Sequence, residues 1–234
     1  MLRVYLLHTD ELKGLAINED LFSMQRKTKI EKLKHEDDKQ LSEAVELLLM
    51  YGLKKIYPSI QFPLSIKEEE SGNLLLEEQL DPPIFFNLSH AKEYAACAIA
   101  DKPVGIDVEW VKTRDVQYME KILHPQEVMI QGFITNPEEK KKFFYECWVT
   151  KESYLKNLGC GLTVRPNEFA VNEEKLETEK SGLENRYVHI YKAGEIEDAD
   201  WKFDASYRLA VCTEKKEEDA VIRILHASDL KDLQ

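Results

Sequence analysis

The chain lacks three features: a long apolar run, a cluster of cysteines and an excess of basic residues. Its cysteines stand singly at Cys97, Cys147, Cys160 and Cys212, which is not the spacing of a zinc site or a disulfide framework. Such cysteine usage is typical of a reducing cytoplasm. No stretch approaches the length of a membrane span, and the apolar run in residues 1–10 is too short for a secretory signal. The net charge of −12 indicates that the chain binds neither nucleic acid nor an anionic membrane.

What is present is enough apolar sequence for a sizeable core. The 234 residues are 43% hydrophobic, which suits one domain or two modest halves. Helical spacing of apolar residues predicts a helix that begins near Asp37 or Asp38 and ends near Gly52, and a longer helix over 138–158 that ends in Gly159-Cys-Gly161. Alternating or apolar runs predict strands over 1–10, 84–86, 93–100, 104–109, 169–171, 187–192, 207–213 and 221–225, with 87–90 as a loop.

Two carboxylates share one face of the strand over 104–109. Strand side chains alternate, so Ile106 and Val108 point one way while Asp107 and Glu109 point the other. On its own, such a pair is more typical of an edge strand with a solvated acidic face.

The long helix carries a third carboxylate. Glu152 and Lys156 are one turn apart, and taken alone they form an ordinary surface ion pair. If Glu152 lay near Asp107 and Glu109, the three would form an oxygen-rich site suited to Mg²⁺ and to a diphosphate.

Several cationic or polar side chains would suit an anion at such a site. They are Ser89 and His90 after the strand over 84–86, the basic segment 26–34 with Arg26 and Lys29, and Lys151 together with Lys156.

Three sequence blocks together resemble the signature of Sfp-type 4′-phosphopantetheinyl transferases. They are Asn87-Leu-Ser-His90, Gly105-Ile-Asp-Val-Glu109 and Trp148-Val-Thr-Lys-Glu-Ser-Tyr-Leu-Lys156, the last followed by Gly159-Cys-Gly-Leu162. The resemblance implies an α+β fold of two similar halves, 1–104 and 105–234, related by a pseudo-twofold axis, in a monomer with the active site between the halves. The segments 94–100 and 207–213 have similar patterns, which agrees with a weak internal duplication.

The resemblance also implies a reaction. The enzyme would transfer the phosphopantetheine arm of coenzyme A to a serine of an acyl or peptidyl carrier protein, in fatty acid, polyketide or nonribosomal peptide synthesis. Asp107, Glu109 and Glu152 would hold Mg²⁺, while Lys156 would face the diphosphate and the departing 3′,5′-ADP. Glu152 or a metal-bound water would take the serine proton.

For the rest of coenzyme A, the resemblance implies contacts from His90, Ser89, Lys151, Arg26 and Lys29. The segment 111–124, with Lys112, Arg114, Tyr118, Met119 and Lys121, would face the carrier protein.

Two departures and two alternatives remain. Relatives often have Gly-Lys-Pro where this chain has Gly72-Asn-Leu74, and an arginine expected early in the helix has no counterpart in 39–42. One alternative is a phosphodiesterase or hydrolase acting on coenzyme A. The other is a regulator that binds coenzyme A or a carrier without turnover.

Overall fold

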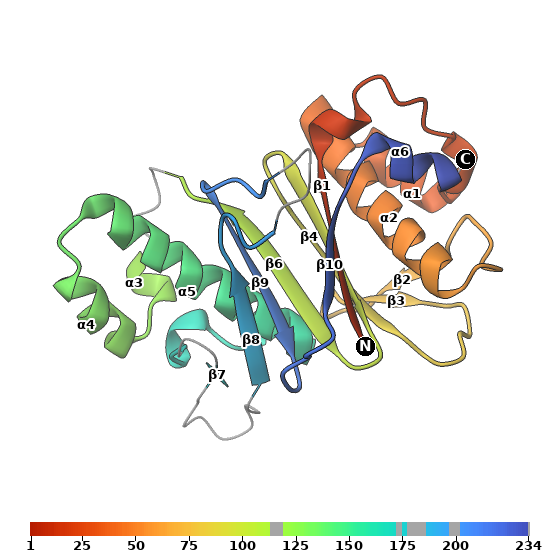
Figure 1. Cartoon of the computed structure of the whole chain (residues 1–234). Coiled ribbons are helices and arrows are strands. Elements are labelled where there is room, and N and C mark those ends of the chain that lie inside the picture. The colour runs from red at the N-terminus through yellow and green to blue at the C-terminus, as the bar shows by residue number, and fades with distance from the viewer. Residues whose placement is uncertain (113–118, 172–174, 177–185, 197–201, 234) are drawn as a thin grey trace.

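Four layers make up the molecule, two helical layers outside and two β-sheets stacked between them (Figure 1). The structure is a computed structural model that describes residues 1–112, 119–171, 175–176, 186–196 and 202–233. None of the helices among these residues is long and apolar enough to cross a membrane.

The first sheet is built mainly from the N-terminal part of the chain. Its strand order is β10 (Val221–Leu225), β1 (Leu2–His8), β5 (Tyr94–Ala100) and β4 (Phe85–Ala91). β1 runs parallel to β10 and antiparallel to β5. Every residue of β5 is buried, because one face of the sheet is covered by helix α2 (Glu36–Ile56) and the other by the second sheet.

Helix α2 continues past Gly52, where the sequence pattern predicted its end, so that prediction was wrong. A Cβ on Gly52 would lie 2.4 Å from Ile99 Cδ1 and 2.7 Å from Tyr5 Cε2. The glycine therefore serves close packing of α2 on the sheet rather than helix termination. Helices α1 (Met24–Glu31) and α6 (Ala227–Leu230) and the short hairpin of β2 (Ile66–Glu68) and β3 (Leu74–Leu76) complete this side of the molecule.

The second sheet has the order β6 (Val104–Trp110), β9 (Tyr207–Thr213), β8 (Arg186–Tyr191) and β7 (Lys175–Leu176), with antiparallel neighbours throughout. Helix α5 (Pro137–Leu158) covers its outer face, confirming the long helix predicted over 138–158. Gly159 ends this helix in a left-handed conformation at φ 63°, as its sequence predicted. Helices α3 (Met119–Ile122) and α4 (Pro125–Phe133) pack beside α5.

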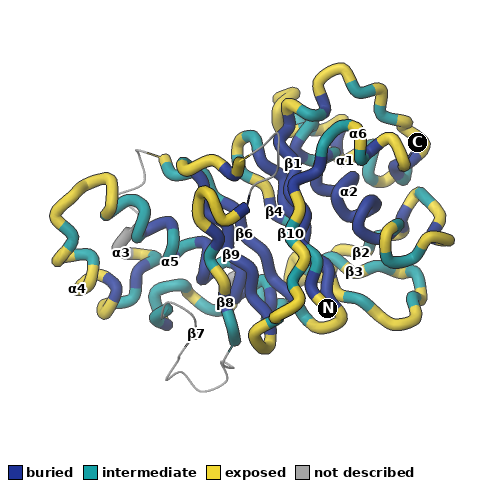
Figure 2. Tube along the Cα trace, viewed as in Figure 1, coloured by how far each residue is buried: buried dark blue, intermediate teal, exposed yellow. Residues whose placement is uncertain are grey.

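The two sheets meet through a shared apolar layer. Val4, Leu6 and Ala96 contribute from the first sheet, and Ile106 and Val211 from the second. Figure 2 shows these central strands as buried, with the exposed segments at the periphery. The two sheets are therefore held together by a continuous core.

The two halves repeat one chain topology. In each, a strand leads to a long helix and then to two antiparallel strands, and the first strand pairs with the last: β1, α2, β4 and β5 in one half, and β6, α5, β8 and β9 in the other. The segments 94–100 and 207–213, noted for their similar patterns, are β5 and β9 and occupy equivalent places. The C-terminal strand β10 returns to the first sheet.

Two local predictions were wrong. Residues 87–90 lie inside strand β4 rather than in a loop, because β5 supplies a complete antiparallel ladder for them. Residues 169–171 form no strand, and Phe169 instead packs its ring on Tyr154 of α5.

Candidate active site

Three polar side chains from three elements meet where the two sheets adjoin. Lys156 Nζ on α5 lies 2.6 Å from Asp107 Oδ1 on β6, and Ser89 Oγ on β4 lies 2.9 Å from the same oxygen. Lys156 also donates to Ser89 Oγ at 3.3 Å and to the carbonyl oxygen of Ile106 at 3.1 Å. The cluster unites three of the predicted site residues and draws on both halves of the chain.

Gly105 allows α5 to approach β6 closely enough to deliver Lys156. A Cβ at Gly105 would lie 1.9 Å from the backbone oxygen of Ser153 and 2.6 Å from the backbone nitrogen of Asn157. Both are main-chain atoms of α5 that no rotamer change would move. The glycine before Asp107 is thus a packing requirement for the site.

The side chains of Asn87 and Ser89 link β4 to β6 by hydrogen bonds where the two sheets adjoin. Asn87 Oδ1 accepts a hydrogen bond from the N–H of Ile106 at 3.1 Å, and Ser89 Oγ accepts one from the N–H of Val108 at 3.2 Å. Because alternate residues of a strand share a face, these two acceptors match the spacing of the two donors. Asn87 was absent from the predicted site, and its period-two spacing from Ser89 was the signal that would have found it.

Glu109 and Glu152 adjoin the cluster but are held differently. Glu109 Oε1 accepts a hydrogen bond of 3.0 Å from Trp148 Nε1 on α5. Glu152 is half-buried and has no hydrogen-bond or ion-pair partner among the residues that the structure describes.

The electrostatics of the carboxylates reflect burial and mutual repulsion. Burial, reinforced by the charge of Asp107, raises the pKa of Glu109 to about 7. The same two causes raise the pKa of Glu152. Burial also raises the pKa of Asp107, against the opposing effects of Lys156 and Ser89. One lysine therefore does not offset the negative charge gathered here.

The chemistry of these side chains suits a divalent cation. Asp107 Oδ2 is buried without a hydrogen-bond partner, and Glu152 is unpaired among the described residues. Carboxylate oxygens are the ligands that Mg²⁺ prefers. Within the described part of the chain, no group of three or more acidic, histidine or cysteine side chains is already arranged to hold a metal. The cation would therefore have to draw the carboxylates together.

Two neighbouring cavities extend from the cluster along β3 and β4. A cavity of about 210 Å³ is lined by Glu152 and Lys156. A second, of about 440 Å³, is lined by Arg26, Lys29 and His90. Both are bordered by Leu74 and Leu88, so they lie side by side.

The basic residues of the larger cavity differ in how freely they could bind an anion. Burial, with the nearby Lys156 charge, lowers the pKa of His90. Arg26 pairs with the buried Glu46 and donates to the carbonyl oxygen of Ser42. Lys29 forms an exposed pair of 3.0 Å with Glu68 on β2.

Lys151 faces away from the cavities, although it precedes Glu152 directly. Its side chain is 0% exposed, and its ammonium lies 2.6 Å from Glu127 Oε2 and 2.8 Å from the carbonyl oxygens of Ile122 and Pro166. Three acceptors match its three donors. The structure therefore gives Lys151 a structural position in the second half, away from the coenzyme A contact that was predicted for it.

The glycines that follow α5 pack against the hairpin turn between β2 and β3. A Cβ on Gly159 would lie 2.2 Å from Asn73 Nδ2, and one on Gly161 would lie 2.7 Å from the backbone oxygen of Ser71. Asn73 and Gly72 line the smaller cavity. The turn is thus part of the wall of the smaller cavity, which Glu152 also lines.

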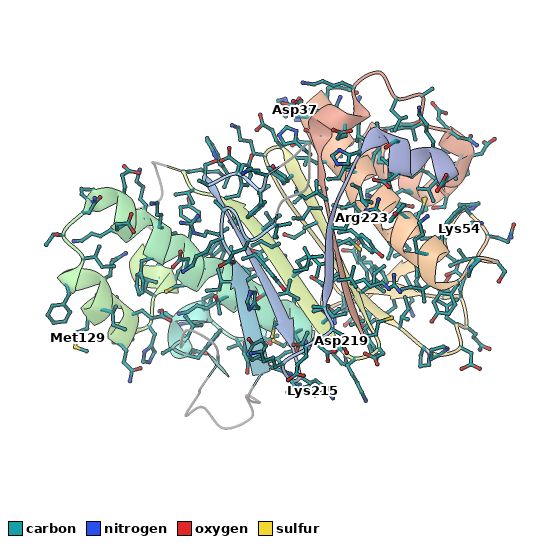
Figure 3. The ribbon with its side chains drawn as sticks, viewed as in Figure 1. Asp37, Lys54, Met129, Lys215, Asp219 and Arg223 are labelled. Atoms are coloured by element: carbon teal, nitrogen blue, oxygen red, sulfur yellow. The ribbon has the colours of Figure 1, made fainter. Side chains whose placement is uncertain are left out.

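Only part of the predicted carrier-facing segment can be placed. Lys112 and Lys121 are exposed, while Arg114, Tyr118 and the side chain of Met119 lie outside the described residues. Beyond the segment, α4 exposes large apolar side chains, and Figure 3 shows one of them, Met129, on the periphery of the molecule. These are Val128, Met129, Ile130 and Phe133.

Comparison with known proteins agrees with the residue signature. The profile of the 4′-phosphopantetheinyl transferase superfamily matches residues 103–212, which include β6, α5 and most of β9. A 4′-phosphopantetheinyl transferase of Bacillus subtilis is 26% identical over 195 residues, 81% of each chain. The 4′-phosphopantetheinyl transferase Sfp of Bacillus subtilis strain 168 is 22% identical over 90% of this chain and 92% of its own. The 4′-phosphopantetheinyl transferase gsp of Aneurinibacillus migulanus is 35% identical over 42% of this chain and 41% of its own. The chain therefore matches the 4′-phosphopantetheinyl transferase superfamily over residues 103–212 and is similar to 4′-phosphopantetheinyl transferases over most of its length.

Proposed function

We propose that this protein transfers the 4′-phosphopantetheine arm of coenzyme A to a serine hydroxyl of an apo acyl or peptidyl carrier protein, and releases 3′,5′-ADP. The observation that supports it most is the Ser89–Asp107–Lys156 cluster, in which Lys156 lines the same cavity as Glu152. We further propose that the repeated topology reflects a pseudo-twofold relation between residues 1–104 and 105–234.

The roles of the site residues follow from their contacts. The serine oxygen would form a bond to the β-phosphorus as the bond to the 3′,5′-ADP oxygen breaks, and Lys156 would stabilise the charge that builds on the departing group. Glu152, which has no partner among the described residues, is free to accept the serine proton in its carboxylate form. Asp107 fixes Lys156 through their 2.6 Å contact.

We assign Asp107, Glu109 and Glu152 as the residues that would hold Mg²⁺. The buried, unpartnered Asp107 Oδ2 and the mutual repulsion of these carboxylates support that assignment. When bound, the cation would offset negative charge on the diphosphate.

The cavity that contains His90, Arg26 and Lys29 would take the phosphorylated nucleoside end of coenzyme A. His90 would gain a proton there, because a bound phosphate opposes the burial that lowers its pKa. We also propose that an exposed surface near Lys112 and Lys121 meets the carrier protein, which is acidic.

The test is an intact-mass measurement. An apo carrier protein is incubated with this protein, coenzyme A and Mg²⁺, and should gain the mass of one phosphopantetheine group, with no gain in EDTA. Matched reactions with Lys156→Ala test the site, and Lys142→Ala, an exposed residue of the same helix, serves as control. Unchanged mass across several acyl and peptidyl carriers would contradict the proposed function. Release of 3′,5′-ADP without a carrier would instead indicate a hydrolase.

A further inference from the structure

Trp148 makes a polar contact in addition to its apolar packing. Its ring lies beside an apolar cluster that includes Phe144 and Tyr145, and is half-buried. Its indole N–H donates to Glu109 Oε1 at 3.0 Å. Because an indole nitrogen only donates, the direction of this hydrogen bond is unambiguous.

The donor to Glu109 is neutral, although a cationic side chain lies opposite Glu109 in the sheet. Arg208 stands directly opposite Glu109 in the ladder between β6 and β9. Its guanidinium nevertheless pairs with Glu146 at 3.0 Å and donates to the carbonyl oxygens of Ala205 and Tyr207. Glu109 thus receives a neutral donor, which fixes its orientation without cancelling its charge.

One oxygen of Glu109 is therefore held and the other is left open. Among the described residues, Glu109 Oε2 has no hydrogen-bond partner. Partners of this kind orient metal-binding carboxylates in proteins, and their loss typically weakens metal affinity by about 10–100-fold.

We infer that Trp148 is a positioning residue for the transfer reaction: its indole N–H holds one oxygen of Glu109 so that the other is presented to a divalent cation. The inference rests on the proposed function for its place in the reaction. It also predicts an effect on cation binding that can be measured without turnover.

The test removes the N–H while keeping the ring. Replacing Trp148 with 3-benzothienylalanine puts a sulfur in place of the indole N–H at nearly the same volume, and Trp148→Phe is the genetically encoded counterpart. Trp110→Phe is the matched control, since Trp110 lies on the same strand as Glu109 and stacks under Lys92. Urea unfolding in EDTA reports whether each variant is folded.

The readouts are Mn²⁺ binding by electron paramagnetic resonance, with and without coenzyme A, and the Mg²⁺ concentration that gives half-maximal transfer. The benzothienyl protein should bind Mn²⁺ about 10–100-fold more weakly and need correspondingly more Mg²⁺, with kcat recovering at saturating Mg²⁺. Trp110→Phe should match the wild type.

Two results would overturn the inference. One is Mn²⁺ affinity of the benzothienyl protein equal to that of the wild type, and the other is a wild type that binds no Mn²⁺ in either condition. A wild type that binds Mn²⁺ in a Trp148-dependent way but modifies no carrier would contradict the proposed function alone.

Discussion

Replacing Lys151 with methionine should destabilise the protein without weakening coenzyme A binding. Lys151 and Glu127 are 0% and 1% exposed, and their contact is 2.6 Å. Removing one partner of a buried pair leaves the other charge uncompensated and costs about 3–5 kcal/mol. The carbonyl oxygens of Ile122 and Pro166 also lose their donor, which places the expected loss at the upper end of that range.

A loss of this size should lower Tm by roughly 6–20 °C in a chain of this length. The assays are urea unfolding, thermal unfolding and the KM for coenzyme A, each measured where the variant is folded. We expect KM to stay within about twofold of the wild type, because the ammonium points away from the cavities.

The matched control is Lys142→Met, in which the same substitution breaks a pair of similar length with Glu139. The partners there are 43% and 55% exposed, so the loss should be below about 1 kcal/mol. A Lys151→Met protein with normal stability and a KM for coenzyme A raised tenfold or more would contradict this prediction and assign Lys151 to the coenzyme A site.

Three further predictions test the site. Gly105→Ala should lower the free energy of unfolding by about 3 kcal/mol or more, because its Cβ meets the backbone of α5, whereas Gly132→Ala, with nothing within 4 Å, should be neutral or stabilising in urea unfolding. Asp107→Asn and Lys156→Ala should each reduce carrier modification by at least about 100-fold while the protein stays folded by circular dichroism, and wild-type rates would remove the residue from the proposed mechanism. In EDTA, the free energy of unfolding should fall as pH rises from about 5 to about 8, because the pKa of Glu109 is raised to about 7 in the folded state, which therefore binds the extra proton. The effect is at most about 3 kcal/mol, Glu109→Gln should flatten it, and a wild-type profile that rises with pH would contradict it.

Carboxylates pair with the basic side chains near the site, so these side chains do not form a separate basic patch. Arg26 and Lys29 are both paired with carboxylates. An incoming polyanion would have to compete with Glu46 and Glu68 for them. Among the described residues, the cation closest to the proposed chemistry is therefore Lys156, which is itself paired with Asp107.

Local rules were sufficient for much of this protein. The alternation of side chains along 104–109 placed Asp107 and Glu109 together on one face, apart from Ile106 and Val108, which lie in the core between the sheets. The spacing over 138–158 and the glycine at 159 predicted α5 and its end. These features depend on the periodicity of the side chains and on backbone conformation, both of which a few neighbouring residues specify.

Other features depended on partners far along the chain. Residues 87–90 are a strand because β5 pairs with them in an antiparallel ladder, and Gly52 serves the close packing of α2 on Tyr5 and Ile99 rather than helix termination. Lys151 and Glu152 are neighbours in sequence but lie in different surroundings, since α4 and the segment after α5 enclose only the first. Local patterns thus specify which residues share a face, whereas long-range packing specifies what each face contacts, because burial and pairing come from segments far along the chain.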